Sequence, residues 1–199
     1  IPYPELTKTI LVYFDTLEDA ANSVSEIIAA KILPSALEFL DKTTIKCVED
    51  FAHLGLDTKV EALLLIEVDG DREIAERDAS KIFEICKKNK CNFINIAKNQ
   101  QEAVKLRAAR KVAFSALARM KPTTILEDAT VPRSEIAKMI AEINRIAKKY
   151  NVTFGIFGHA GDGNLHPTCL TDERNTDEIK RAEEAFEEIF DAAIKLGGT

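Results

Sequence analysis

The stretch Glu61–Val68 reads EALLLIEV, and the turn signal Asp69-Gly70 follows it directly. A short run this rich in large apolar side chains predicts a buried strand, because it is too short for a typical helix. On its C-terminal side, apolar residues recur at helical spacing and predict a helix over Asp71–Asn89. The neighbouring elements can be assigned outward from this strand and helix.

The elements around this strand follow the order β-α-β-β-α-β. They are strands over Thr7–Phe14, Ala36–Leu40 and Asn92–Ile96, a helix over Leu17–Lys31, and a short inserted helix over Thr43–Ala52. This order is typical of the ferredoxin-like α+β fold. We therefore expect an antiparallel sheet with helices packed on one face.

The second half of the chain also alternates helices with strands, and no linker-like stretch divides it from the first. Helices are expected over Asn99–Met120, over Ser134–Tyr150 with Ser134 as the N-cap, and after the capping box at Asn175–Glu178, and strands over Thr123–Asp128, Thr153–His159 and Leu165–Leu170. We expect one α+β domain over residues 1–199.

The composition is that of a globular protein, since 46% of the 199 residues are hydrophobic and 30% are charged. The net charge of −6 argues against a nucleic-acid partner, because neutralising phosphates requires a basic surface. No apolar run reaches the roughly 18 residues of a membrane span, and no secretory leader is evident. The four cysteines form no CxxC pair, so we expect buried, reduced thiols in a cytoplasmic protein.

The stretch Phe157–Pro167, FGHAGDGNLHP, is the part of the chain that carries chemistry. Asp162-Gly163 predicts a two-residue type I′ turn, which would place His159 directly opposite His166. Two adjacent imidazoles suit a divalent ion such as zinc, iron or manganese, although two polar residues at a sheet end would need no metal. A third ligand is required, and the spacing does not choose among Glu127, Asp128 and Asp162.

Arg110 lies on the apolar side of its predicted helix, in the arc that Ala103, Leu106, Ala113, Phe114 and Leu117 define. A guanidinium in such a place is costly unless an anion pairs with it. The anion could be a bound ligand or a structural partner, with Glu127 and Asp128 as candidates. Alternatively, the side chain could reach water from the edge of the stripe.

The block GHAGDGNLHP resembles the signature of the C-terminal domain of FAD-linked oxidases, the group of D-lactate dehydrogenase, glycolate oxidase and D-2-hydroxyglutarate dehydrogenase. The resemblance covers almost the whole chain. Its weaker matches are the opening Ile1–Glu5, the helix motif Leu106–Arg110, the EDATVP of Glu127–Pro132 and the LGGT of Leu196–Thr199. Since the chain begins with Ile1 rather than Met, we expect a fragment of a longer chain.

The resemblance implies a cap domain placed over an FAD that a separate N-terminal domain binds. It implies that His159 and His166 bind a divalent metal (Zn, Mn or Fe) and that Arg110 binds the carboxylate of a small 2-hydroxy acid. It places the third metal ligand and the proton acceptor in a GEHG segment beyond Thr199, so the fragment alone should be inactive and hold no catalytic residue. The turn and flavin-facing candidates are Gly158, Gly161, Asp162, Gly163 and Asn164.

Three positions depart from the family pattern: Arg107 stands where a Trp is usual, and Leu126 and Thr168 replace the Lys and Asn of some members. These departures favour a glycolate- or D-lactate-type substrate over hydroxyglutarate. The resemblance also implies an iron–sulfur or other electron-transfer partner subunit. Two other functions remain open: a stand-alone ferredoxin-like regulatory module that binds a small metabolite, and a metal-dependent hydrolase that uses both histidines.

Overall fold

The structure, a computed structural model, describes residues 3–199, so Ile1 and Pro2 of the expected domain start lie outside it. The strands are β1 (Leu6–Phe14), β2 (Ala36–Asp41), β3 (Ala62–Gly70), β4 (Phe93–Ile96), β5 (Thr123–Leu126), β6 (Ala129–Thr130), β7 (Thr153–His159) and β8 (Asn164–Thr171). The helices are α1 (Leu17–Ala29), α2 (Lys42–Ala52), α3 (Arg72–Lys88), α4 (Gln100–Ala118), α5 (Ile136–Tyr150) and α6 (Thr176–Lys195), and a 3-10 turn, η1 (Arg133–Glu135), precedes α5. These bounds agree closely with those that the sequence predicts.

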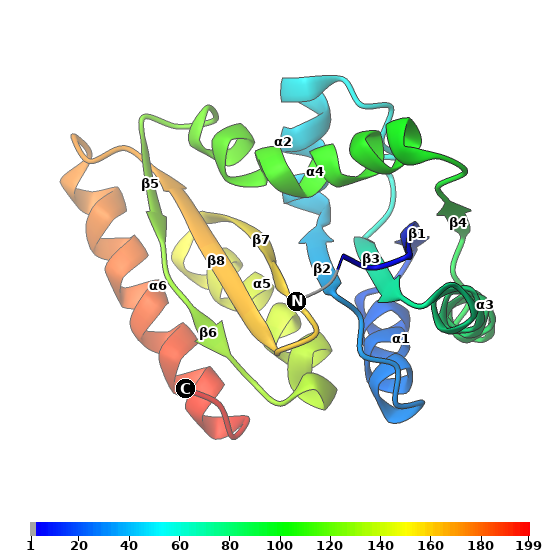
Figure 1. The fold of residues 1–199 in the computed structure, drawn as a ribbon. Helices are drawn as coiled ribbons and strands as arrows, with labels where there is room; N and C mark the ends of the chain where they lie inside the picture. Colours follow the sequence, from blue (N-terminus) through cyan, green and yellow to red (C-terminus); the bar gives the residue numbers. More distant parts are fainter. Residues whose placement is uncertain (1–2) are drawn as a thin grey trace.

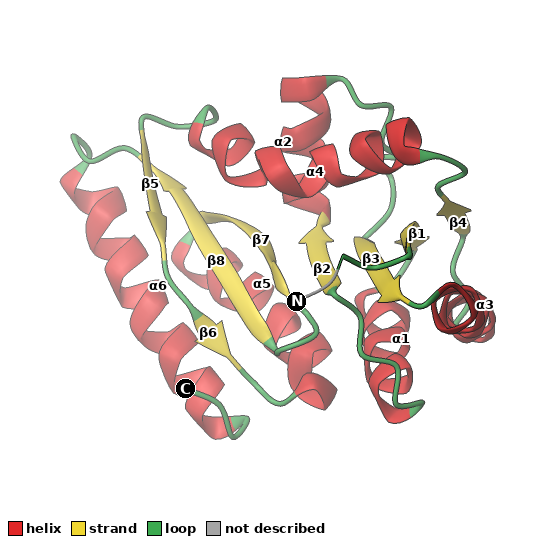
Figure 2. Cartoon of the chain, in the orientation of Figure 1, coloured by secondary structure: helices red, strands yellow, loops and turns green. Residues whose placement is uncertain are grey.

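All strands join one antiparallel sheet in the order β4-β1-β3-β2-β7-β8-β5, with β6 also paired to β8. The first four strands in this order, with α1 and α3, form the expected ferredoxin-like unit, into which α2 is inserted. The second unit joins it where β7 pairs with β2, near the middle of the sheet (Figures 1 and 2). The α+β antiparallel fold expected from the sequence is confirmed.

The second unit repeats the element order of the first, with β5 and β6 followed by α5, β7, β8 and α6. After α6, Thr199 reaches β6 and exchanges two backbone hydrogen bonds with Thr130, at N···O distances of 2.9 and 3.1 Å. An exchange of both bonds between one pair of residues is the antiparallel pattern. The end of the chain therefore lies against the open edge of the sheet.

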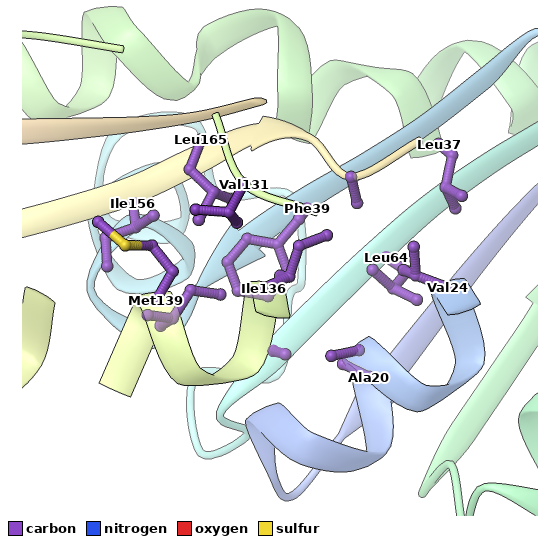
Figure 3. Packing of buried hydrophobic residues seen from close by; sticks show 14 of the residues in the cluster. Ala20, Val24, Leu37, Phe39, Leu64, Val131, Ile136, Met139, Ile156 and Leu165 are labelled. Atoms are coloured by element: carbon purple, nitrogen blue, oxygen red, sulfur yellow. The ribbon is translucent and has the colours of Figure 1, made fainter. Parts of the chain in front are cut away.

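The alternation of side chains along each strand gives the sheet two apolar faces. On one face, Val12 and Phe14 of β1 belong to a large cluster that also contains residues of α1, α3, α5 and α6, and Figure 3 shows part of it. On the other, Leu11 and Tyr13 belong to a smaller cluster that also contains residues of α2 and α4. Helices on one face were expected, and four helices follow that arrangement, whereas the inserted α2 and the connecting α4 cover part of the opposite face.

One expected helix start and one expected strand end differ from the structure. Ser134 is not an N-cap, because η1 takes up Arg133–Glu135 and α5 begins at Ile136 without a side-chain cap. The expected strand Thr123–Asp128 stops at Leu126. The physical reason is Pro167, which lies opposite this break and has no N–H to donate to the ladder.

The four cysteines are buried and unpaired, as expected. Burial raises the pKa of the Cys86 and Cys169 thiols to about 12. None of the helices within residues 3–199 has both the length and the apolar character needed to cross a bilayer.

Candidate functional site

The hairpin between β7 and β8 carries both candidate histidines, and its turn differs from the expected one. The expected opposition of His159 and His166 is wrong, since His159 pairs with Asn164 and Phe157 pairs with His166. The loop spans four residues, because the Asp162 N–H donates to the His159 carbonyl and the Gly163 N–H to the Ala160 carbonyl. Only Gly163 has a positive φ, of 77°, so the turn is not type I′.

The two imidazoles nevertheless lie next to each other. A change of register by two residues keeps a side chain on the same face of a strand, so His159 and His166 still share a face. Their ring centroids are 5.3 Å apart and the rings are nearly perpendicular, with an interplanar angle of 89°. The structure therefore brings together the pair that the sequence singled out, in a diagonal arrangement.

Each imidazole is held by a carboxylate from another strand or loop. His159 Nδ1 lies 2.8 Å from Glu38 Oε1, and these two residues stand directly opposite each other in β7 and β2. His166 Nδ1 lies 2.5 Å from Asp128 Oδ1, since the register on either side of the β5–β6 break sets Asp128 opposite His166. An ionised carboxylate can only accept, so Nδ1 is the donor in both rings. Neither Nε2 has a hydrogen-bond partner within residues 3–199.

Arg110 reaches this cluster from α4. Its Nε donates to Glu38 Oε2 at 2.6 Å, and its guanidinium carbon lies 4.9 Å from the centroid of the Phe157 ring. The expected structural partners, Glu127 and Asp128, are therefore the wrong carboxylates: within the described chain, Glu38 is the acidic partner of Arg110. The terminal nitrogens Nη1 and Nη2 have no protein partner in that same part of the chain.

A second arginine–carboxylate pair lies beside the first. Arg107, one helical turn before Arg110, donates from Nη1 to Glu67 Oε1 at 2.7 Å, and the Thr9 hydroxyl also donates to this carboxylate. Glu67 belongs to β3, the neighbour of β2 in the sheet. Two carboxylates from adjacent strands thus neutralise two guanidiniums from one helix.

The metal donors that the described residues offer are two imidazoles. No group of three His, Cys, Asp or Glu side chains in residues 3–199 is arranged to hold an ion. Asp128 contacts the Nδ1 of His166, which orients the ring. Asp162, with His159, Glu38 and Arg133, lines a cavity of about 220 Å³. None of the three carboxylates considered from the sequence completes a ligand set.

The hairpin candidates are packed tightly against their own neighbours. A Cβ on Gly158 would lie 2.3 Å from the Asn164 carbonyl oxygen, and one on Gly163 would lie 2.0 Å from that of Val131. The Gly161 carbonyl accepts a hydrogen bond from Arg133 Nε, and the Asn164 side chain accepts one from the Thr130 hydroxyl. Backbone packing therefore accounts for glycine at positions 158 and 163, and a flavin-facing role for the hairpin candidates stays a prediction.

Sequence reasoning missed Glu38, which contacts both Arg110 and His159. A signal was present, because Glu38 is the one charged residue in the predicted strand Ala36–Leu40 and has apolar residues on both sides. Its partners are far away in the sequence, 72 and 121 positions along the chain. The pairing of β2 with β7 makes His159 a neighbour of Glu38, and the packing of α4 on the same face of the sheet brings Arg110 to it.

Comparison with known proteins gives a consistent picture. Residues 3–199 match the family described as FAD linked oxidases, C-terminal domain. The chain is 57% identical to the glycolate oxidase subunit GlcD of Bacillus subtilis and 34% identical to that of Escherichia coli, each over 199 residues. It is 31% identical over 191 residues to a D-lactate dehydrogenase of Archaeoglobus fulgidus. The matches cover 100%, 100% and 93% of this chain, but only 42%, 40% and 40% of those relatives.

Two solved structures share the fold at low sequence identity. A p-cresol methylhydroxylase with substrate bound superposes with a TM-score of 0.70 at 16% identity, over 100% of this chain and 45% of that one. A 4-ethylphenol oxidase from Gulosibacter chungangensis gives a TM-score of 0.71 at 14% identity, over 100% and 46%. At these identities the likeness concerns the fold alone.

Proposed function

The chain belongs to the family of FAD linked oxidases, C-terminal domain, and from this we propose that it is the substrate-binding cap of an FAD-dependent oxidoreductase. Its substrate would be a small 2-hydroxy acid of the glycolate or D-lactate type. The chain spans about two fifths of the curated relatives it matches. The activity would belong to a longer protein that also contains an FAD-binding domain. The observation that carries the proposal is the grouping of Arg110 with two imidazoles on one face of the sheet.

Arg110 would bind the substrate carboxylate. Because Glu38 takes only Nε, the Nη1 and Nη2 donors are left to meet the two oxygens of a carboxylate in parallel. The Phe157 ring against the guanidinium keeps this fork in a defined plane. A carboxylate held here would place the hydroxyl-bearing carbon of a 2-hydroxy acid near the histidines, one bond further along the molecule.

His159 and His166 fit two positions of a divalent metal site. A ligating imidazole normally donates its other nitrogen to a carboxylate or carbonyl, and Glu38 and Asp128 provide such partners. A bound divalent ion would polarise the substrate hydroxyl and favour loss of its proton. The third ligand would come from a GEHG segment following Thr199. The antiparallel pairing of Thr199 with Thr130 supports this, because a chain continuing along β6 would pass Asp128 and approach His166.

The bound FAD would accept a hydride from the α-carbon of the substrate. The cap's own residues would bind and orient: Arg110 fixes the carboxylate, and the two imidazoles face the hydroxyl. We assign no residue of this chain as the acceptor of the substrate hydroxyl proton. The acceptor would be the His of the GEHG segment. The cap without the rest of the protein should therefore not turn over substrate.

The experiment is a substrate assay on the complete flavoprotein. We expect bound FAD and dye reduction that depends on glycolate or D-lactate. Arg110→Lys should raise the KM for the acid, because an ammonium cannot make the paired contact. A flavin-free protein, or one that reduces no dye with either acid, would contradict the proposed activity.

Metal content tests the histidine site separately. Zinc, manganese and iron are measured in the complete protein and in its His159→Ala and His166→Ala variants after dialysis. Each variant should lose metal, because either change leaves a single imidazole. Unchanged metal content in both variants would remove the metal from the proposal.

A stand-alone ferredoxin-like module that binds a small anionic metabolite is the second candidate. The complete β1-α1-β2-β3-α3-β4 unit favours it. It predicts tight binding of a carboxylate ligand to this chain without flavin, which calorimetry on the isolated chain would detect. For the oxidoreductase, by contrast, we expect a cytoplasmic protein with an electron-transfer partner, and the relatives named as glycolate oxidase subunits are consistent with a multi-subunit enzyme.

A further inference from the structure

We propose that Glu38 is a positioning residue, whose single carboxylate fixes both the guanidinium of Arg110 and the tautomer of His159. The inference rests on the proposed function, because it assigns a role within the same site. It concerns a residue of the first ferredoxin-like unit, whereas the histidines belong to the second.

Glu38 is well placed to hold two partners at once. Its Oε1 lies 2.8 Å from His159 Nδ1, and its Oε2 lies 2.6 Å from Arg110 Nε. Its side chain is only 13% exposed, so water competes weakly for these oxygens. Both oxygens are thereby used, each by a different donor from a different element of the fold.

For Arg110, the contact with Glu38 fixes the orientation of the guanidinium. A guanidinium held at Nε can rotate little about its long axis, and Phe157 packs against its face at 4.9 Å. The Nη1–Nη2 edge, which has no protein partner within residues 3–199, is then the edge available to a carboxylate. Without Glu38, the side chain would lose this constraint and its affinity for the substrate would fall.

For His159, the consequence is the position of the proton. The carboxylate only accepts, so the ring must carry its proton on Nδ1 and keep the Nε2 lone pair free. This is the tautomer that a ligand through Nε2 needs. One carboxylate therefore prepares the site for the substrate and for the metal.

The substitution Glu38→Gln tests whether the hydrogen bonds of Glu38, rather than its volume, position Arg110 and His159. The amide has nearly the same shape but offers one acceptor and one donor group. If its oxygen keeps the charge-assisted bond from Arg110, its NH₂ faces His159 Nδ1 and requires that nitrogen to accept. The proton of His159 would then move to Nε2, where it blocks metal ligation.

Glu67→Gln is the matched control. Glu67 stands on the neighbouring strand β3, accepts from Arg107 at 2.7 Å, and contacts neither His159 nor Arg110. The two variants thus make the same chemical change in two similar arginine pairs on one helix, and only one of them touches a histidine.

The first measurement is the histidine tautomer in metal-free protein. The chain has three histidines, so selective ¹⁵N labelling gives few signals, and a His159→Gln sample identifies the relevant one. Long-range ¹H–¹⁵N spectra at alkaline pH should show His159 protonated at Nδ1 in the wild type and in Glu67→Gln, and at Nε2 in Glu38→Gln. A wild-type ring protonated at Nε2 would overturn the inference even if a variant failed to fold, as would a Glu38→Gln ring still protonated at Nδ1.

The second measurement is made on the complete flavoprotein. Glu38→Gln should weaken metal retention against a chelator by about 10- to 100-fold, the usual effect of losing the carboxylate behind a ligating histidine. Glu38→Ala should raise the KM for the 2-hydroxy acid more than it lowers kcat. If the wild type, Glu38→Gln and Glu38→Ala retain metal equally and have equal KM values, the role of Glu38 is refuted. If the wild type oxidises no 2-hydroxy acid, the proposed function is refuted, but the tautomer result stays valid.

Discussion

The buried carboxyl of Asp41 should make the stability of the chain depend on pH in a way that one substitution removes. Asp41 ends β2 and caps α2, where its Oδ1 accepts the Thr44 N–H at 2.8 Å. Only 4% of the residue is exposed, and burial raises the pKa of the carboxyl from 3.8 to about 6, against the lowering effect of Thr44. The folded state therefore holds this proton more tightly than the unfolded state.

The sign of the effect follows from linkage. A group that binds its proton more tightly in the folded state lowers the free energy of unfolding as pH rises between the two pKa values. For Asp41 the loss begins near pH 4 and levels off above pH 6. From pH 4.5 to pH 7 it amounts to about 2 kcal/mol. Asp41→Asn keeps a good N-cap acceptor and has no proton to lose.

The assay is urea denaturation of the wild type and Asp41→Asn across pH 4.5 to 7. The stability of the variant relative to the wild type should rise by about 2 kcal/mol over this range. Asp50→Asn, a change at an exposed carboxyl of the same helix α2, controls for the loss of one negative charge. Wild-type and Asp41→Asn profiles that run parallel over the whole range would refute this account of the buried carboxyl.

Three other outcomes can be measured on the same chain. Gly163→Ala should destabilise the chain more than Gly55→Ala, because the two glycines have nearly equal φ values of +77° and +78° but only a Cβ at position 163 would meet a carbonyl, 2.0 Å from Val131 O. Similar unfolding midpoints for the two variants would contradict the clash. Native protein should react with a thiol reagent far more slowly than urea-unfolded protein, since all four cysteines are buried; rapid native labelling would show that these thiols are accessible. Leu117→Ala should lower the free energy of unfolding by about 2–5 kcal/mol because Leu117 is fully buried, whereas Ile74→Ala should lower it much less because Ile74 is 42% exposed. Equal losses of stability in the two variants would argue against the packing described.

Local features of the fold could be predicted from the sequence because they depend on neighbouring residues. The strand at Glu61–Val68 appears as β3 over Ala62–Gly70, and the strand at Thr153–His159 has its expected bounds. The Asn175 side chain accepts the Glu178 N–H, which is one of the two bonds of the predicted capping box, while the Asn175 N–H donates to the Asp172 carbonyl instead. Hydrophobic periodicity and caps act within a few residues, so a single sequence contains them in full.

The site was only partly predictable, because its geometry depends on pairings between distant strands. The face shared by His159 and His166 followed from their separation, but the loop length did not, since the dipeptide Asp162-Gly163 suits more than one turn. A need for an anion beside Arg110 was foreseen, yet its partner Glu38 depends on how α4 packs on the sheet, and the contact of Glu38 with His159 depends on the β2–β7 register. No local pattern specifies that register.

Because β2 pairs with β7, the candidate site contains residues from both halves of the chain. Glu38 and Arg110 come from residues before the second unit, and His159 comes from within it. A chain cut between α4 and β5 would separate Glu38 and Arg110 from both histidines, so neither piece would hold the proposed site residues together. When the two pieces are mixed, a restored contact between Glu38 and His159 would report that the β2–β7 pairing has formed again.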